Sequence, residues 1–218
     1  DILDTKLFSR DSAHVLDIPI GLGDEDAVIS LRLGEGTSHH GLIGGGTGGG
    51  KSTLLHTIIM SSMLHYSPDQ LHLYMMDFKG GTEFKIYESE RLPHIQLLAL
   101  DAMQEFGESI LQNLIEEMEN RSNAFKNAGG YTKIEDYVRG TGNPMPRILV
   151  IMDEFQILFD DSTNRKVAMR SANHAKRIVT EGRAYGVHLL MATQSTNIIS
   201  TLTLDRGTIE QMRVRIGL

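Results

Sequence analysis

The chain has 218 residues, which is the size of one domain with a short appendage. It contains no cysteine, which excludes a disulfide framework, thiolate chemistry and cysteine-ligated zinc or iron–sulfur sites. No stretch of about 18 apolar residues and no secretory leader is recognisable, so neither a membrane-spanning helix nor a secretory signal is expected within this stretch. The net charge of −7 argues at first sight against a surface that binds nucleic acid. Because the chain begins at Asp1 rather than Met, we expect it to be part of a longer protein.

The N-terminal segment predicts two short strands, at residues 16–20 and 28–33, joined by a turn region rich in Gly and acidic residues. We expect them to form a hairpin-like edge of the main sheet. This small β extension is assigned to residues 1–36, and the main domain to residues 37–218.

The rest of the chain alternates between strand and helix patterns. Apolar runs of strand length occur at 41–43, 71–76, 94–100, 148–152 and 187–192, and helical periods at 54–64, 102–127, 134–138 and 163–185. This alternation predicts an α/β fold with a mostly parallel sheet covered by helices on both faces. Helix 102–127 is expected to bury one side that carries Phe106, Ile110, Leu114, Ile115, Met118 and Phe125. The last residues, 213–218, alternate like a strand, and we expect the domain to continue beyond them.

A glycine-rich loop follows the first of these apolar runs. Seven of the ten residues from 41 to 50 are glycine, and the stretch from Gly45 to Ser52 reads GGTGGGKS, which satisfies the pattern G-x-x-x-x-G-K-[ST]. In that pattern loop N–H groups surround the phosphates, the lysine reaches the β- and γ-phosphates, and the hydroxyl binds Mg²⁺. The alternative, a glycine-rich turn with an incidental lysine, is disfavoured by the strand before the loop and the helix after it. The predicted nucleotide-binding residues are Gly45, Gly46, Thr47, Gly48, Gly49, Gly50, Lys51, Ser52 and Thr53.

Two carboxylates follow the most apolar strand: Asp153 and Glu154 come directly after residues 148–152. Ligands of open α/β sheets bind at the carboxyl ends of the strands. We therefore expect Asp153 to hold Mg²⁺ together with Ser52, through water, and Glu154 to be the general base that polarises the attacking water. The alternative is a strand that simply ends in solvated acids.

Two further strands end in polar residues. If strand 187–192 lies between the phosphate-loop strand and the Asp153 strand, Gln194 is placed to contact the γ-phosphate or the attacking water; otherwise it only caps its strand. Asp77 follows strand 71–76 with the same ambiguity, and a structural or substrate-orienting role is favoured there.

Helix 163–185 is basic, with six Lys/Arg against the single acid Glu181. Most of these residues are typical of a solvated charged face. Arg183 differs because it ends the helix just before the strand of Gln194, and it is the candidate for an arginine finger that acts on a neighbouring subunit's nucleotide. Residues 163–218 hold nine Lys/Arg and three Asp/Glu, so any contact with a polyanion is expected from this quarter.

Three stretches resemble the FtsK/SpoIIIE ATPases of the FtsK–HerA superfamily. They are residues 44–53, the run ILVIMDEF at 148–155, and GRAYGVH at 182–188 leading to ATQ at 192–194. Their order and spacing match that family from about Ile18 to Ile216. The resemblance implies a RecA-like P-loop core, a hexameric ring and ATP-driven movement of a polymer through the pore. It also implies that Arg183 is the trans-acting finger and Gln194 the γ-phosphate sensor.

Two branches of that family differ in the polymer they move. Chromosome and plasmid translocases grip double-stranded DNA, whereas EccC-type ATPases of type VII secretion export proteins. The stretches DFKGG at 77–81 and LPH at 92–94 resemble the secretion branch more, and Ser195-Thr196 follow Gln194 where translocases carry Arg-Pro. The chain also ends before the family's later lysine sensor and holds no winged-helix DNA-reading domain.

From these patterns we expect a Mg²⁺-dependent ATPase that acts as a ring motor on double-stranded DNA. Two alternatives stay open: an EccC-type ATPase that drives protein secretion, and a nucleotide-gated interaction module with little turnover, against which Glu154 and Arg183 argue. In the longer protein we expect tandem ATPase domains, a cytoplasmic location for this domain and a membrane anchor elsewhere.

Overall fold

The computed structural model describes residues 7–81, 83–89, 91–195 and 203–218, so Thr196 lies outside the described part. Its centre is a six-stranded sheet in the order β5-β4-β6-β7-β3-β8, in which every neighbouring pair is parallel. The predicted α/β class with a parallel sheet is confirmed. The strands are β3 (Gly41–Gly44), β4 (Leu71–Asp77), β5 (Ile95–Ala99), β6 (Arg147–Asp153), β7 (Val187–Thr193) and β8 (Val214–Gly217).

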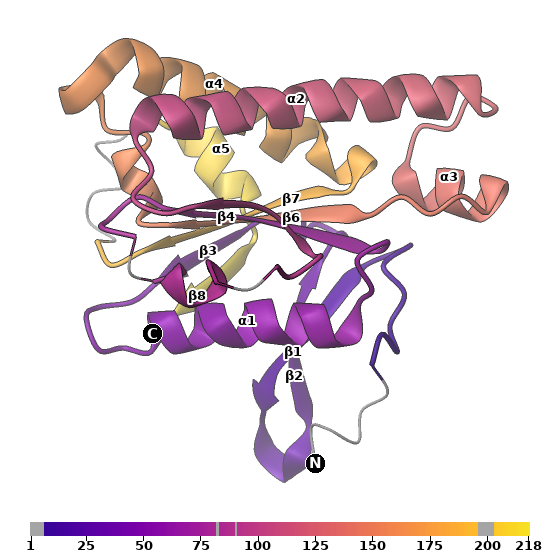
Figure 1. The fold of residues 1–218 in the computed structure, drawn as a ribbon, viewed down its shortest axis with the longest axis horizontal. Coiled ribbons are helices and arrows are strands. Elements are labelled where there is room, and N and C mark those ends of the chain that lie inside the picture. Colours follow the sequence, from indigo (N-terminus) through magenta and orange to yellow (C-terminus); the bar gives the residue numbers. More distant parts are fainter. Residues whose placement is uncertain (1–6, 82, 90, 196–202) are drawn as a thin grey trace.

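Helices cover both faces of this sheet, as predicted (Figure 1). On one face lies α1 (Lys51–His65); on the other lie α2 (Gln104–Asn127), α4 (Asp161–Tyr185) and α5 (Arg206–Gln211), with α3 (Ile134–Thr141) beyond the end of α2. Among the residues that the structure describes, the short 3₁₀ turns are η2 (Asp24–Asp26), η3 (Lys85–Tyr87) and η4 (Phe155–Ile157). Within the described ranges, no helix has the length and hydropathy needed to cross a bilayer.

The N-terminal strands β1 (Leu16–Leu22) and β2 (Val28–Leu33) pair antiparallel in a separate two-stranded sheet. The predicted hairpin is therefore present, but its placement at the edge of the main sheet is wrong. The physical reason is that its apolar residues, such as Leu16 and Leu33, are buried in one cluster with Leu55 and Ile58 of α1. The hairpin thus buries a face against a helix instead of pairing its backbone with the sheet. The boundary between residues 36 and 37 stays a prediction.

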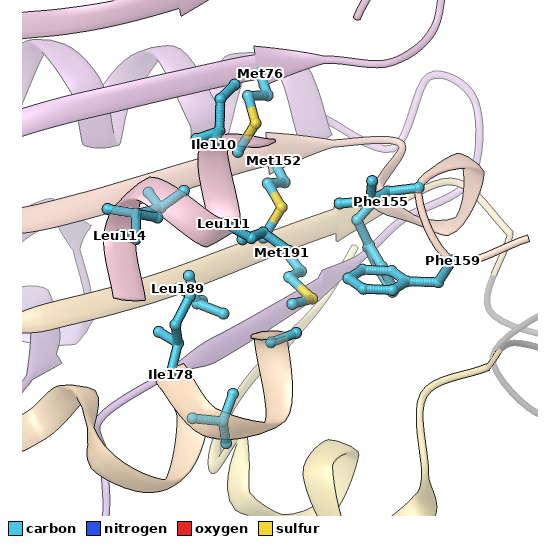
Figure 2. Packing of buried hydrophobic residues seen from close by; sticks show 14 of the residues in the cluster. Met76, Ile110, Leu111, Leu114, Met152, Phe155, Phe159, Ile178, Leu189 and Met191 are labelled. Carbon is cyan, nitrogen blue, oxygen red and sulfur yellow. The ribbon is translucent and has the colours of Figure 1, made fainter. Parts of the chain in front are cut away.

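Two hydrophobic cores lie on the two sides of the sheet. Along β6, Ile148, Val150 and Met152 belong to the cluster that includes α2 and α4. Leu149 and Ile151 belong to the cluster that includes α1 and the β1–β2 hairpin. Because both faces are covered, β6 is an unbroken apolar run rather than an alternating one. Figure 2 shows the first cluster, in which the methionines of three adjacent strands, Met76, Met152 and Met191, lie near Ile110 and Leu111 of α2, and Leu189 of β7 lies beside Ile178 of α4.

The buried side of α2 differs from the prediction at one residue. Phe106 is 49% exposed, so its assignment to the core side is wrong. At this end of the helix the buried position is Gly107, where an added Cβ would lie 2.8 Å from Phe78 and 2.9 Å from Leu158. The close approach of these two side chains leaves space for a glycine only, and Phe106 is turned to the surface.

Candidate nucleotide and metal site

The carboxyl ends of β3, β4, β6 and β7 meet at one edge of the sheet. In the strand register Asp77 is opposite Asp153, Asp153 is opposite Ala192, and Gly44 is opposite Thr193. Strand β7 lies between β3 and β6, which is the condition on which the predicted role of Gln194 depended. The fold therefore brings the glycine-rich loop, the paired acids and Gln194 to the same edge.

The glycine-rich loop is held by backbone hydrogen bonds and opens on one side. Gly45 N donates to Thr193 O (3.2 Å), and Gly49 N donates to Gly46 O (2.9 Å). Gly48 and Gly50 have φ of +82° and +97°, a left-handed conformation that side chains disfavour. An added Cβ at Gly46, Gly48 or Gly50 would have no neighbouring atom within 4 Å. Because Gly50 directly precedes α1, the positive end of the helix faces this open side, which fits a phosphate group.

Lys51 is the first residue of α1 and its side chain is buried. Its ammonium bonds to Asp153 Oδ1 and lies 3.4 Å from Glu154 Oε1. All three side chains are 6% exposed or less. Burial raises the pKa of Asp153 above its ordinary value, and the nearby ammonium of Lys51 opposes that rise. Two buried carboxylates thus share one cation.

Glu154 occupies a strained position directly after β6. Its backbone has φ +51° and ψ +44°, which is rare for a residue with a side chain. Gln156 Nε2 donates to Glu154 Oε2 over 2.6 Å. The other oxygen, Oε1, is buried and accepts no hydrogen bond from the described residues. A buried carboxylate oxygen with unused capacity beside Lys51 fits a hydrogen bond to a further group, such as a water.

The remaining polar residues at this edge pair with one another. Thr47 Oγ1 donates to Gln194 Oε1 over 3.3 Å, which joins the loop to the end of β7. Asp77 accepts hydrogen bonds from the backbone N–H groups of Lys79 (2.8 Å) and Glu83 (3.1 Å). These bonds favour a structural role for Asp77, because its carboxylate fixes the loop after β4.

Ser52 donates a hydrogen bond to Glu83, a residue that the sequence patterns did not indicate. Glu83 lies in an irregular loop, away from the strand ends where functional acids are sought. The signal that would have found it is its position in the loop that follows Asp77, six residues downstream of an acid at the same sheet edge.

The donor set at this edge fits Mg²⁺ bound together with a nucleotide. Ser52 and Asp153 supply a hydroxyl and a carboxylate, and Mg²⁺ prefers oxygen ligands. No group of three His, Cys, Asp or Glu side chains gathers as a metal site among the described residues. In nucleotide sites Mg²⁺ takes one or two protein ligands, and phosphates and water supply the others, so one hydroxyl and one carboxylate are enough.

Two of the predicted site residues lie elsewhere. Arg183 is exposed near the end of α4, at the opposite end of β7 from Gln194. The seven residues of β7 span roughly 23 Å, so Arg183 does not reach the glycine-rich loop of the same chain. Thr53 is exposed on α1 and lines a groove of about 880 Å³ between α1 and the β1–β2 hairpin.

The family model that matches the chain is that of the FtsK/SpoIIIE family, over residues 1–197. The chain belongs to the FtsK/SpoIIIE family. This FtsK/SpoIIIE domain is 31% identical over 196 residues to the ESX secretion system protein EccC of Thermomonospora curvata. It is 32% identical over 201 residues to the DNA translocase FtsK of Streptococcus pyogenes. The matched part is 85% of this chain and 14% of EccC, and 87% of this chain and 24% of FtsK.

Solved structures agree with this assignment. The cytoplasmic domain of the type VII secretion ATPase EccC from T. curvata has a TM-score of 0.77 and 30% identity, and the match covers 100% of this chain and 25% of that chain. The conjugation coupling protein TcpA of pCW3, solved with ATPγS, has a TM-score of 0.71 over 96% of this chain and 55% of that chain, and at 24% identity it supports the fold. This FtsK/SpoIIIE chain is therefore an ATPase domain with a P-loop core, and its relatives include both DNA translocases and secretion ATPases.

Proposed function

We propose that this domain hydrolyses ATP with Mg²⁺ at the sheet edge formed by the glycine-rich loop and the end of β6. The observation that carries the proposal is the convergence of Lys51, Ser52, Asp153 and Glu154 from two separate elements at that edge. A glycine loop alone binds a phosphate; the paired acids beside it supply the groups that hydrolysis needs.

The four residues have different tasks in this proposal. Lys51 would hold the β- and γ-phosphates with its ammonium, and Ser52 and Asp153 would hold the Mg²⁺. Bound Mg²⁺ would neutralise part of the phosphate charge. Glu154 accepts a proton from the attacking water through its unused oxygen, and Gln194, held by Thr47, hydrogen-bonds the γ-phosphate.

We also propose that the domain works in a ring, with six copies as the expected number. Arg183 is exposed at the sheet edge opposite its own nucleotide loop, so it suits contact with the nucleotide of a neighbouring subunit. An arginine supplied in this way contributes about 10³–10⁵ to the rate in other nucleotide hydrolases.

From the sequence we expected double-stranded DNA as the transported polymer. We propose protein instead, and two observations support this choice. The DNA hypothesis needs free positive charge in the C-terminal quarter, but several basic residues of α4 are paired with acids. The pairs are Arg170–Glu108 (3.1 Å), Lys176–Asp205 (3.0 Å) and Arg177–Glu119 (2.9 Å). Their charge is locally compensated, which weakens attraction to a polyanion. The similarity to EccC over most of the chain supports the same proposal.

Double-stranded DNA is the second candidate, because the FtsK of S. pyogenes matches this chain at 32% identity. The two candidates differ in a measurable way. We expect duplex DNA to leave ATP turnover by the intact protein unchanged. If turnover rises with DNA, the protein proposal is wrong and the domain is a DNA translocase.

Hydrolysis itself is tested by replacing the general base. Glu154→Gln is expected to bind ATP with unchanged affinity and to lose about 10²–10⁴-fold in turnover. The exposed Glu88→Gln is the matched control and keeps wild-type turnover. If the wild type binds ATP tightly but barely hydrolyses it, the domain is a nucleotide-gated module and the hydrolase proposal is wrong.

The setting of the domain is proposed from its relatives. The chain spans 14% of EccC and 24% of FtsK, so we propose that it is one cytoplasmic ATPase domain of a longer, membrane-anchored protein with tandem ATPase domains. The T. curvata structure is itself described as a cytoplasmic domain, which supports this location.

A further inference from the structure

The carboxylate of Glu83 contacts the hydroxyl that is proposed to bind the metal. Ser52 Oγ donates a hydrogen bond of 2.7 Å to Glu83 Oε2. Glu83 belongs to the loop after β4, whereas Ser52 belongs to the first turn of α1, so the contact joins two elements that are 31 residues apart in sequence. None of the roles assigned above to the acids of this site involves Glu83.

Glu83 is held in place by neighbours on several sides. Its backbone N–H donates to Asp77 Oδ2 (3.1 Å), at the end of β4. Its second carboxylate oxygen lies 3.2 Å from His56 Nε2, and His56 Nδ1 lies 2.9 Å from the hydroxyl of Tyr87. His56 is one helical turn after Ser52, so both side chains leave α1 on the same face. The Glu83 side chain is only 17% exposed.

A serine hydroxyl has one proton to donate and two lone pairs. When that proton is directed to Glu83, the lone pairs of Ser52 are left for a cation on the side of the nucleotide. Partners of this kind orient the groups that bind a metal, and their loss costs about 10–100-fold in metal affinity.

We propose that Glu83 is a positioning residue that orients the Ser52 hydroxyl toward Mg²⁺. The inference rests on the proposed Mg²⁺-dependent ATPase function and deepens it. Glu83 acts through Ser52 and not on the nucleotide, so it affects the metal-dependent part of ATP binding and leaves the metal-free part unchanged.

The experiment measures ATP affinity by equilibrium binding of a fluorescent ATP analogue to the intact protein, first in EDTA and then across a Mg²⁺ titration. For Glu83→Ala we expect unchanged affinity in EDTA and an increase of about tenfold in the Mg²⁺ concentration at half-effect. Glu83→Gln keeps an oxygen that accepts the hydrogen bond from Ser52 but loses the negative charge. We expect the Mg²⁺ concentration at half-effect to increase about threefold in this variant. The control is Glu88→Ala, which removes the same charge from an exposed position nearby and leaves both affinities unchanged.

A double-mutant cycle separates positioning from a general effect on the fold. Ser52→Ala combined with Glu83→Ala is expected to show no larger Mg²⁺ defect than Ser52→Ala alone, because the two residues act as a unit. Full additivity overturns the proposal. Tighter Mg²⁺-dependent ATP binding by Glu83→Ala also overturns it, because Glu83 would then compete for the metal site. A Mg²⁺ titration of Glu83→Ala that is identical to that of Glu88→Ala overturns it as well.

Failure of this inference is distinguishable from failure of the proposed function. If the wild type shows a clear Mg²⁺ effect on ATP affinity and Glu83→Ala shows the same effect, only the role of Glu83 is refuted. If the wild type itself shows no Mg²⁺ effect, the proposed metal-dependent function fails, and the role of Glu83 fails with it.

Discussion

Replacing Lys51 by Met is predicted to destabilise the nucleotide-free protein by an amount that grows with pH. In the structure its ammonium is shared by two buried carboxylates, Asp153 and Glu154. Removing the cation leaves these groups buried without compensation, and breaking a buried pair in this way costs about 3–5 kcal/mol. For a domain of this size, that corresponds to a fall in melting temperature of roughly 6–20 °C.

The pH dependence follows from the pKa of Asp153. Burial raises this pKa above the ordinary value of 3.8, so the folded protein holds the proton more tightly than the unfolded chain does. The stability contributed by this group is therefore present at low pH and is lost as the pH rises from about 3.8 through the folded-state pKa. Lys51→Met removes a positive charge that lowers the pKa of Asp153. The pH range over which the stability contributed by Asp153 is lost therefore extends to higher pH. The variant is expected to lose more stability relative to the wild type at pH 8 than at pH 5.

Urea denaturation of the wild type and the variant at both pH values, without nucleotide, measures the difference. Lys166→Met, at an exposed position of α4, is the control and is expected to change stability by less than about 0.5 kcal/mol. Adding Asp153→Asn to Lys51→Met is expected to restore part of the loss. Equal destabilisation at pH 5 and pH 8, or none at either, would refute the reasoning. Lys51→Met is also expected to abolish ATP binding.

Three other substitutions test separate parts of the structure. Arg147 is buried and donates hydrogen bonds to the backbone carbonyls of residues 12–14. Arg147→Met should lower the free energy of unfolding by about 3 kcal/mol and speed amide hydrogen exchange in that segment. Unchanged exchange there would contradict the anchoring role. At Gly182 an added Cβ would lie 2.7 Å from Val187 O, so Gly182→Ala should lower stability by about 1–3 kcal/mol in urea denaturation, and a neutral result would show that α4 shifts freely. Arg183→Ala should leave ATP affinity unchanged and slow turnover by about 10³-fold, with partial recovery when it is mixed with the Glu154→Gln variant; normal turnover would exclude the finger.

Much of the fold could be predicted from local patterns. The apolar run that became β6 and the helical period that became α1 were identified because their residue spacing reports a backbone conformation fixed within a few residues. The position of the β1–β2 hairpin was not predictable in this way. Its alternating pattern specifies a half-buried strand pair, but the element that covers its apolar side, here α1, is chosen by long-range packing.

The same division applies to the candidate site. The sequence by itself determined the glycine loop with Lys51 and Ser52 and the strand ending in Asp153, because each is a contiguous motif whose chemistry depends on adjacent residues. The tertiary structure alone decided that β7 lies between β3 and β6, which brings Gln194 to Thr47, and that Arg183 lies at the far edge. It alone also placed Glu83 against Ser52, because an irregular loop has no periodicity from which its position can be inferred. Glu83 is held there by contacts with Asp77 and His56.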